Sequence, residues 1–251
     1  MTVREFYDFL CERIPVDTRQ DTDYDGMICC PCPDRNVEKV LICLDVTDDI
    51  IDEVVEEDCQ VILTHHPLYR GALREIGAGD YNGRRICRLV NAGICAMSFH
   101  TRLDGSAGGV GELLAKLIGV IPDGRISNHG INIIGHLEEP VYAAEFAARI
   151  KEVLGAPFVQ YTDTGRPIKT VAVAGGGVGS YFRDVIAAKA DAFVGGEMSY
   201  HDLLDSKDAG FCAFMAGHFF TENPVCAKLF ELTVEAGAMP IMTFSNSIET
   251  I

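Results

Sequence analysis

The stretch Val61–Arg70, V-I-L-T-H-H-P-L-Y-R, begins as an apolar run and ends in two adjacent histidines. The run over 61–64 predicts a short buried strand. Pro67 cannot donate a ladder hydrogen bond and keeps His66 out of helical geometry, so the strand must end at the histidines. Neighbouring side chains of an extended chain point in opposite directions, so the two imidazoles could each serve one of two neighbouring metal ions. The alternative is that one histidine packs and the other is solvated.

Strands and helices alternate on both sides of this stretch. The predicted strands are residues 39–46, 60–64, 94–99, 131–135, 157–161, 170–174, 192–194, 211–216 and 241–244. The predicted helices are residues 3–13, 47–57, 82–91, 109–118, 141–154, 179–189, 200–207 and 224–236. Residues 17–36, which are rich in Asp, Pro and Gly, are expected to form a loop. The alternation indicates an α/β architecture with mainly parallel sheets.

Local signals mark several helix ends. Thr2 and Glu5 form a capping-box pattern, Thr47 is expected to cap the next helix, and Gly93 is expected to end the helix over 82–91. The best candidate for a domain boundary is the stretch 120–130. We expect residues 1–126 to form a first α/β domain with 218–251 packed onto it, and residues 127–217 to form a second.

The composition narrows the classes of function. The chain has 251 residues, a formal net charge of −16 and 48% apolar residues. The acid excess and the lack of a basic patch disfavour a nucleic-acid partner. No stretch approaches the roughly 20 apolar residues of a membrane span, and the N-terminal residues lack an apolar signal core, so a cytoplasmic location is expected.

The ten cysteines do not predict a disulfide framework. Several lie in apolar, strand-like runs, where cysteine behaves as a small hydrophobe, and a reducing cytosol is the simpler setting. Cys29, Cys30 and Cys32 form a C-C-P-C cluster, but no second pair with zinc-site spacing follows. Reactive or solvent-facing thiols are the favoured interpretation of the cluster.

Three apolar strands are followed directly by histidines. They lead to His65 and His66, to His100 and to His218. Ligands of α/β folds bind beyond the carboxyl ends of strands, so these segments could converge on one site. Asp104 lies four residues after His100, and Glu222 four after His218. At that spacing two side chains share a face if the chain turns helically.

Imidazole nitrogens together with carboxylates suit Zn, Mn, Fe, Co or Ni better than Ca or Mg. Two such ions about 3.5–4 Å apart can share a carboxylate and activate a bridging water for attack on an electrophile. The alternative is structural: His218 would cap a helix, Glu222 would complement its dipole, and Asp104 would cap the following helix.

Four blocks of the sequence, in order along nearly the whole chain, resemble one family. They are H-H-P-L, S-F-H-T-R-L-D-G-S-A-G-G-V-G-E-L-L-A, V-G-G-E-M-S-Y-H-D and A-G-H-F-F-T-E-N. They are similar to the Nif-three-like dinuclear metal centre family, also labelled GTP cyclohydrolase 1 type 2. The resemblance implies two interwoven three-layer α/β domains, a homohexamer and two divalent transition-metal ions. Its implied metal ligands are His65, His66, Asp104, His218 and Glu222.

His100 and His201 belong to the same blocks, and we interpret them as substrate-orienting or acid–base groups. Glu197 is a weaker candidate. One departure lies near the site: the family commonly has an Asn-x-Gly-Leu-type turn, whereas this chain has Tyr24-Asp25-Gly26-Met27.

The leading hypothesis is metal-dependent hydrolysis of a small substrate, such as attack on the purine ring of GTP, with Arg70 or Arg102 offsetting the charge of an anionic substrate. A second enzyme hypothesis rests on Val171–Ser180, V-A-V-A-G-G-G-V-G-S, which resembles a dinucleotide-binding turn. It lacks the third glycine, and we favour a tight turn that lets strand and helix approach closely. A non-catalytic metal-binding scaffold for partner proteins is the remaining alternative.

Overall fold

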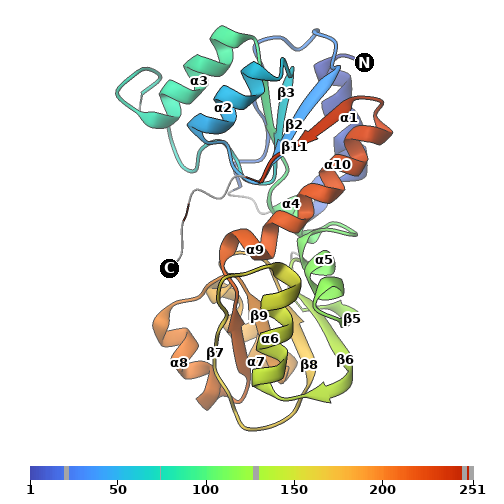
Figure 1. Ribbon diagram of the computed structural model, residues 1–251, viewed down its shortest axis with the longest axis vertical. Helices are drawn as coiled ribbons and strands as arrows, with labels where there is room; N and C mark the ends of the chain where they lie inside the picture. The colour runs from blue at the N-terminus through green and yellow to red at the C-terminus, as the bar shows by residue number, and fades with distance from the viewer. Residues whose placement is uncertain (20–22, 74, 127–129, 245–247, 249–251) are drawn as a thin grey trace. The chain divides into compact units, whose positions relative to one another are not determined.

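The computed structural model describes most of the chain, namely residues 1–19, 23–73, 75–126, 130–244 and 248. The chain forms two compact units, each built around one sheet (Figure 1). The first unit contains Met1–Leu103 and the segment that starts at Val225, and the second contains Asp104–Pro224. The domain boundaries expected from the sequence, at 126/127 and 217/218, remain a prediction. Residue 127 lies outside the described residues.

The sheet of the first unit has five strands. Their spatial order is β1 (Gly26–Cys29), β4 (Cys95–Ser98), β3 (Val61–Thr64), β2 (Lys39–Cys43) and β11 (Met239–Met242). Strands β4, β3, β2 and β11 are parallel, and β1 joins β4 antiparallel. Four helices pack on this sheet: α2 (Asp48–Glu56) and α3 (Tyr81–Ala92) on one side in Figure 1, and α1 (Val3–Arg13) and α10 (Cys226–Glu235) on the other.

The sheet of the second unit has six strands. Their order is β5 (Val120–Arg125), β6 (Ile133–Val141), β8 (Ile168–Val173), β9 (Ala192–Gly195), β10 (Cys212–Met215) and β7 (Gln160–Tyr161). Strands β8, β9 and β10 are parallel, whereas β5, β6 and β7 join antiparallel. Its four longer helices are α5 (Val110–Leu117), α6 (Ala143–Leu154), α7 (Phe182–Ala188) and α8 (Tyr200–Ala209).

Both faces of the second sheet are buried. Along β8, Val171 and Val173 belong to the core that includes Phe146 of α6, while Ala172 belongs to the core that includes Val185 of α7. The second half of the strand, residues 171–173, is therefore apolar on both faces, as parallel strands between two helical layers are. The predicted α/β class is confirmed, and every antiparallel pair includes a strand at a sheet edge or next to one.

The predicted helix ends agree with the structure. Thr2 and Glu5 form both hydrogen bonds of the capping box at α1. The Thr47 hydroxyl accepts a hydrogen bond from the backbone N–H of Ile50, and Gly93 ends α3 in the left-handed region at φ 68°. These signals are local, so they act in any tertiary setting.

Two strands were missed by the sequence analysis. Strand β1 lies inside the stretch 17–36 that was expected to be a loop, and β5 lies inside the expected boundary stretch. Each is an edge strand whose pairing is interrupted by a bulge, in β1 between Met27 and Cys29. A short edge strand with a bulge has no clear period-2 pattern, so its pairing partner decides its conformation.

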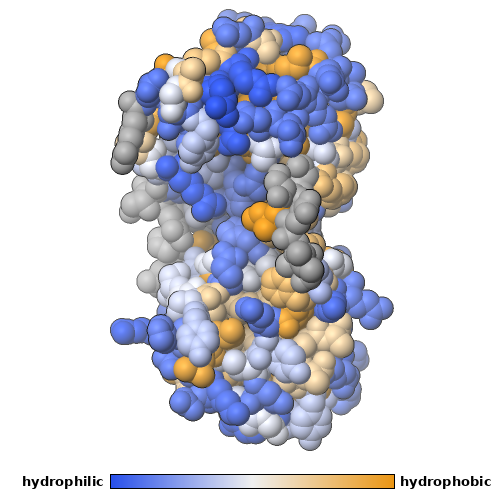
Figure 2. Space-filling view, turned by 60° about the vertical axis from the view of Figure 1, so that its left-hand side comes forward, coloured by the Kyte–Doolittle hydropathy of each residue, from blue (hydrophilic) through white to orange (hydrophobic). Residues whose placement is uncertain are grey.

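The remaining elements are short. They are α4 (Thr101–Gly105), α9 (His218–Glu222), and the 3-10 helices η1 (Val16–Thr18), η2 (Gly179–Tyr181) and η3 (Asn223–Val225). Within the described ranges, no helix combines the length and apolar character needed to cross a membrane. Hydrophilic residues cover much of the first unit on the face shown in Figure 2, in keeping with the acidic composition.

Candidate metal centre

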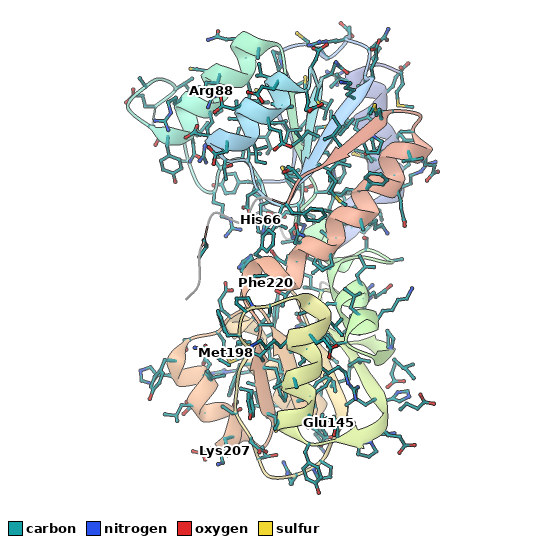
Figure 3. The ribbon with its side chains drawn as sticks, viewed as in Figure 1. His66, Arg88, Glu145, Met198, Lys207 and Phe220 are labelled. Carbon is teal, nitrogen blue, oxygen red and sulfur yellow. The ribbon has the colours of Figure 1, made fainter. Side chains whose placement is uncertain are left out.

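Three histidines of the first unit lie together beyond its sheet. His65 and His66 follow β3, and His100 follows β4, the strand beside it. The ring centroids lie 5.0 Å apart for His65 and His66, 5.2 Å for His65 and His100, and 5.6 Å for His66 and His100. One nitrogen of each ring lies within 4.8 Å of the other two. Figure 3 labels His66 at this edge of the sheet.

The two neighbouring histidines do not alternate as strand residues would. Strand β3 ends at Thr64, and the chain bends at His65 and His66. The backbone N–H of His66 donates to Leu44 O at 2.9 Å, and the Thr64 hydroxyl donates to His66 O at 2.6 Å. Because the bend ends the extended geometry, both imidazoles approach His100 and form one group.

Each of these three rings binds an oxygen through the same nitrogen. Nδ1 lies 3.0 Å from Phe99 O in His65, 2.8 Å from Asp45 Oδ1 in His66 and 2.7 Å from Asp23 Oδ1 in His100. Carbonyl and carboxylate oxygens only accept, so each Nδ1 carries the proton and donates it. In the neutral form of each ring, Nε2 is then the atom with a lone pair for a cation, which is the usual arrangement of histidine ligands.

Asp23 holds His100 and the start of α4 together. It also accepts hydrogen bonds from the backbone N–H of Thr101 at 2.9 Å and from the Thr101 hydroxyl at 2.6 Å. Burial by itself raises the pKa of Asp23, but the hydrogen bonds from His100 and Thr101 outweigh it and hold the pKa far below its usual range. Asp23 is therefore an anion that orients His100.

Asp25 belongs to the turn that departs from the family pattern. Its side chain accepts from the backbone N–H of His100 at 2.8 Å and lies 2.8 Å from Arg102 Nε. The two side chains are buried, with 1% of Asp25 and 4% of Arg102 exposed. Burial raises the pKa of Asp25 more than the Arg102 charge lowers it. Asp25 thus holds the segment 100–102 through a hydrogen bond to the backbone of His100 and a buried ion pair with Arg102.

The second unit carries a different group of candidate ligands. Asp104 lies in α4, and His218 and Glu222 lie four residues apart on α9. The His218 Nε2 atom is 2.8 Å from Glu222 Oε2, so the spacing does place these side chains on one helical face. A carboxylate oxygen of Asp104 lies within 4.8 Å of one of Glu222.

His218 lies between two carboxylates. Its Nδ1 atom is 2.7 Å from Glu197 Oε1, while its Nε2 atom faces Glu222. Glu222 is only 5% exposed. Burial lowers the pKa of His218, but the hydrogen bonds and charges of Glu197 and Glu222 outweigh it and raise the pKa to about 10. In the absence of a cation, the carboxylates therefore keep His218 protonated, which shows how strongly this group attracts positive charge.

The glycine run after β8 packs against α9. A Cβ atom on Gly176, which has φ +65°, would lie 2.1 Å from Glu222 Oε1, and one on Gly175 would lie 2.9 Å from Glu222 Cγ. The backbone N–H of Gly176 donates to the Thr221 hydroxyl at 3.1 Å. The run therefore allows the close strand-to-helix approach that the sequence analysis favoured, and this approach positions Glu222.

His201 belongs to neither group of candidate ligands. It is exposed on the first turn of α8, where its ring packs edge-on against Tyr200 at 5.5 Å. Glu197, the weaker candidate, contacts His218 directly. Asp45 and Asp23 were not among the site residues expected from the sequence. Asp45 follows β2 as the histidines follow β3 and β4, a signal that could have identified it, whereas Asp23 stands in an Asp-rich stretch that resembles a solvated loop.

The donor set of both groups consists of imidazole nitrogens and carboxylate oxygens. That set fits divalent transition metals, because Ca and Mg prefer shells made of oxygen alone. In the described part of the chain, the groups that could hold a metal ion draw on these histidines, Asp104 and Glu222 and include no cysteine. The residues present therefore fit a site for a transition metal.

Comparisons with known proteins agree with this fold and donor set. The family model described as Duf34/NIF3 (NGG1p interacting factor 3) matches residues 1–247. A Clostridium perfringens protein named GTP cyclohydrolase 1 type 2 homolog is 29% identical over 242 residues, covering 94% of this chain and 92% of that protein. A Schizosaccharomyces pombe protein named NIF3 homolog is 28% identical over 220 residues, covering 79% of this chain and 78% of that protein.

Solved structures share the fold. A Staphylococcus aureus hypothetical protein superposes with a TM-score of 0.89 at 22% identity, covering 100% of this chain and 99% of that one. Reduced HcgD from Methanocaldococcus jannaschii superposes with a TM-score of 0.83 at 22% identity, covering 96% and 97%. With a family match over nearly the whole sequence and the same α/β fold, the chain belongs to the Duf34/NIF3 family.

Proposed function

We propose that this protein binds two divalent transition-metal ions through His65, His66, Asp104, His218 and Glu222, and that it hydrolyses a small substrate at them. The resemblance of the sequence blocks supports the ligand set, and the name GTP cyclohydrolase 1 type 2 homolog of its relatives supports a nucleotide as the first substrate class to test.

The single observation that carries the proposal is the common orientation of the imidazoles in the first unit. Three rings from two adjacent strand ends each donate Nδ1–H to an oxygen, to Phe99 O, Asp45 or Asp23. Histidines that merely pack or cap a helix have no reason to share one tautomer and to bring their nitrogens within 4.8 Å of each other.

Bound divalent ions would supply Lewis-acid activation of water near neutral pH. His100 would supply acid–base chemistry: because Asp23 accepts its Nδ1 proton, Nε2 can take a proton from a reacting group and return it. His201, exposed on α8, is assigned to contact with the substrate. Glu197 would orient His218, since it contacts Nδ1 and leaves Nε2 directed at Glu222.

The charge of an anionic substrate would have to be offset by the ions and by exposed cations. Arg102 does not serve this purpose, because it is 3% exposed and paired with Asp25. Arg70 is exposed and remains the candidate. A homohexamer and a cytoplasmic location are further parts of the proposal, and both rest on the family resemblance and the sequence.

The test is elemental analysis of tag-free protein purified without chelator. We expect about two transition-metal ions per chain, and a sharp loss in His66→Ala and Glu222→Ala. His136→Ala is the matched control, because His136 also pairs with an aspartate, Asp123 at 2.8 Å, but belongs to neither group. The metal-loaded protein is then assayed against GTP and other nucleotides.

The outcomes separate the hydrolase from the scaffold alternative. A chain that stays metal-free after reconstitution with zinc, manganese or iron would refute the proposal. A chain that binds two ions and turns over no member of a broad substrate panel would favour the metal-binding scaffold, a role in keeping with the words "interacting factor" in the family description.

A further inference from the structure

Two cysteines face each other across the outer ladder of the first sheet. In the antiparallel register of β1 and β4, Cys29 pairs with Ala96 at the end of the ladder, and continuing this register by one residue places Cys30 opposite Cys95. The two sulfur atoms are 3.6 Å apart, and the Cys95 thiol donates to Cys30 Sγ. Residues directly opposite in an antiparallel ladder have Cα atoms about 4.5–5.5 Å apart, within the range of about 4.4–6.8 Å found for disulfides.

The neighbouring cysteines of the cluster are placed differently. Cys29 packs with Ala96 in the core under α2 and α3, so its side chain points to the opposite face from that of Cys30. The Cys32 sulfur lies beside Gly93, 3.6 Å from where a Cβ atom on that glycine would stand. Register and direction thus select Cys95 as the partner of Cys30.

The two thiols also differ in accessibility. Cys30 is partly exposed, whereas Cys95 is fully buried. Burial raises the pKa of the Cys95 thiol to about 12, so Cys95 keeps its proton and can donate it to Cys30. An oxidant from solvent therefore meets Cys30 first, with Cys95 in place as the second thiol.

We propose that Cys30 and Cys95 form a redox-active dithiol that a small peroxide oxidises to a cross-strand disulfide. Cys30 sulfur attacks one peroxide oxygen: an S–O bond forms, the O–O bond breaks, and the leaving oxygen departs as water after taking the thiol proton. Cys95 sulfur then attacks the Cys30 sulfenic acid: the S–S bond forms, the S–O bond breaks, and a second water leaves with the Cys95 proton. The two sulfurs lose two electrons in total, and hydrogen peroxide gains them.

The pair lies on the same ladder as the support of His100. At the other end of that ladder Gly26 pairs with Ser98, and Asp25 and Asp23 bind the segment that starts at His100. A disulfide would tie β1 to β4 and so hold this edge strand, with its two aspartates, on the sheet. The inference does not depend on hydrolase activity, because it concerns only the two strands.

The test uses the full-length protein as purified, treated with stoichiometric hydrogen peroxide and then with an alkylating agent. Non-reducing peptide mapping should find Cys30 linked to Cys95, reversed by dithiothreitol. The closed loop is long, so the oxidised form should melt about 5–10 °C higher than the reduced form. Cys30→Ser should abolish both effects, whereas Cys32→Ser and Cys87→Ser should retain them.

Peptide mapping of the unsubstituted protein shows whether the Cys30–Cys95 disulfide forms, even if Cys30→Ser folds poorly. A Cys30–Cys32 link, a sulfinic acid on Cys30 with no link, or full alkylation of both thiols after peroxide treatment would each overturn the proposal. A link that forms without any rise in Tm would overturn the inference that it holds β1 on the sheet.

Discussion

The two groups of candidate ligands use histidine in different ways. In the first unit, three imidazoles share one tautomer, because each donates Nδ1–H to an oxygen. In the second unit, one imidazole lies between the carboxylates of Glu197 and Glu222 and is held in the protonated form.

The difference shows what each unit can offer a cation. The first group presents imidazole nitrogens whose orientation depends on partners from neighbouring segments, above all Asp45 and Asp23. The second group presents negative charge, and its position depends on how closely the glycine run approaches α9. Metal binding by the first group should therefore be most sensitive to changes in the residues that orient its rings. Metal binding by the second group should be most sensitive to changes in backbone packing.

Gly176→Ala should have the largest effect on stability and metal binding, and it changes only the packing around the second group. The new methyl group would collide with Glu222 Oε1, 2.1 Å away, and would sit on a left-handed backbone. We expect a loss of about 3–5 kcal/mol in the free energy of unfolding and weaker metal binding, measured by urea denaturation and elemental analysis.

Gly155→Ala is the matched control for this substitution. Gly155 has a similar φ of +62°, but nothing lies within 4 Å of the position of a Cβ atom. It should lose only about 1–2 kcal/mol, the cost of backbone strain. Equal losses in the two variants would show that contact with Glu222 is unimportant.

Asp45→Asn should weaken the first group without changing its shape. The carboxylate that accepts the His66 Nδ1 proton at 2.8 Å becomes a neutral amide, which orients the ring less well. We expect metal affinity to fall about 10–100-fold, measured by competition with a chromophoric chelator. Asp123→Asn changes the other aspartate–histidine pair, at His136, and should leave the affinity unchanged.

Asp23→Asn tests whether the first unit depends on this buried anion. Because its pKa is depressed in the folded state, Asp23 contributes stability above its usual value of 3.8 and loses that contribution as pH falls below it. The variant should be about 1–2 kcal/mol less stable at neutral pH, and its urea midpoint should converge with that of the unsubstituted protein in acid. Parallel curves from pH 7 to acid would contradict this assignment.

Glu197→Gln should have the smallest effect, because Glu197 is half exposed. In the chelator-treated protein the pKa of His218 is raised to about 10 from an ordinary 6.5. This contribution to stability is complete below about pH 6.5 and is lost as pH rises through about 10. The Tm of the unsubstituted protein should fall more over this window than that of the variant; after metal loading the two should behave alike.

Much of the fold could be predicted from local pattern. The capping residues Thr2 and Thr47, the left-handed Gly93 and the alternation of apolar runs are signals carried by a few consecutive residues. The placement of histidines just after strands also followed, because Pro67 and the polarity change mark a strand end in the sequence itself. These features need no knowledge of which strands are neighbours.

Partners that meet across strands could not be predicted in this way. Strand β1 is an interrupted edge strand in an acidic stretch, and only its pairing with β4 brings Asp23 to His100 and Cys30 to Cys95. The glycine run was ambiguous for the same reason, since its neighbour on α9 is distant in sequence.

The sequence by itself determined the α/β class, most helix and strand positions and the residue types of the donor set, because periodicity, caps and strand ends are local properties of the chain. The tertiary structure alone decided which nitrogen of each histidine donates a hydrogen bond and which carboxylates orient the ring or raise its pKa. It also decided which thiols face each other. Those choices depend on strand order and register, which bring together side chains that lie far apart in the sequence.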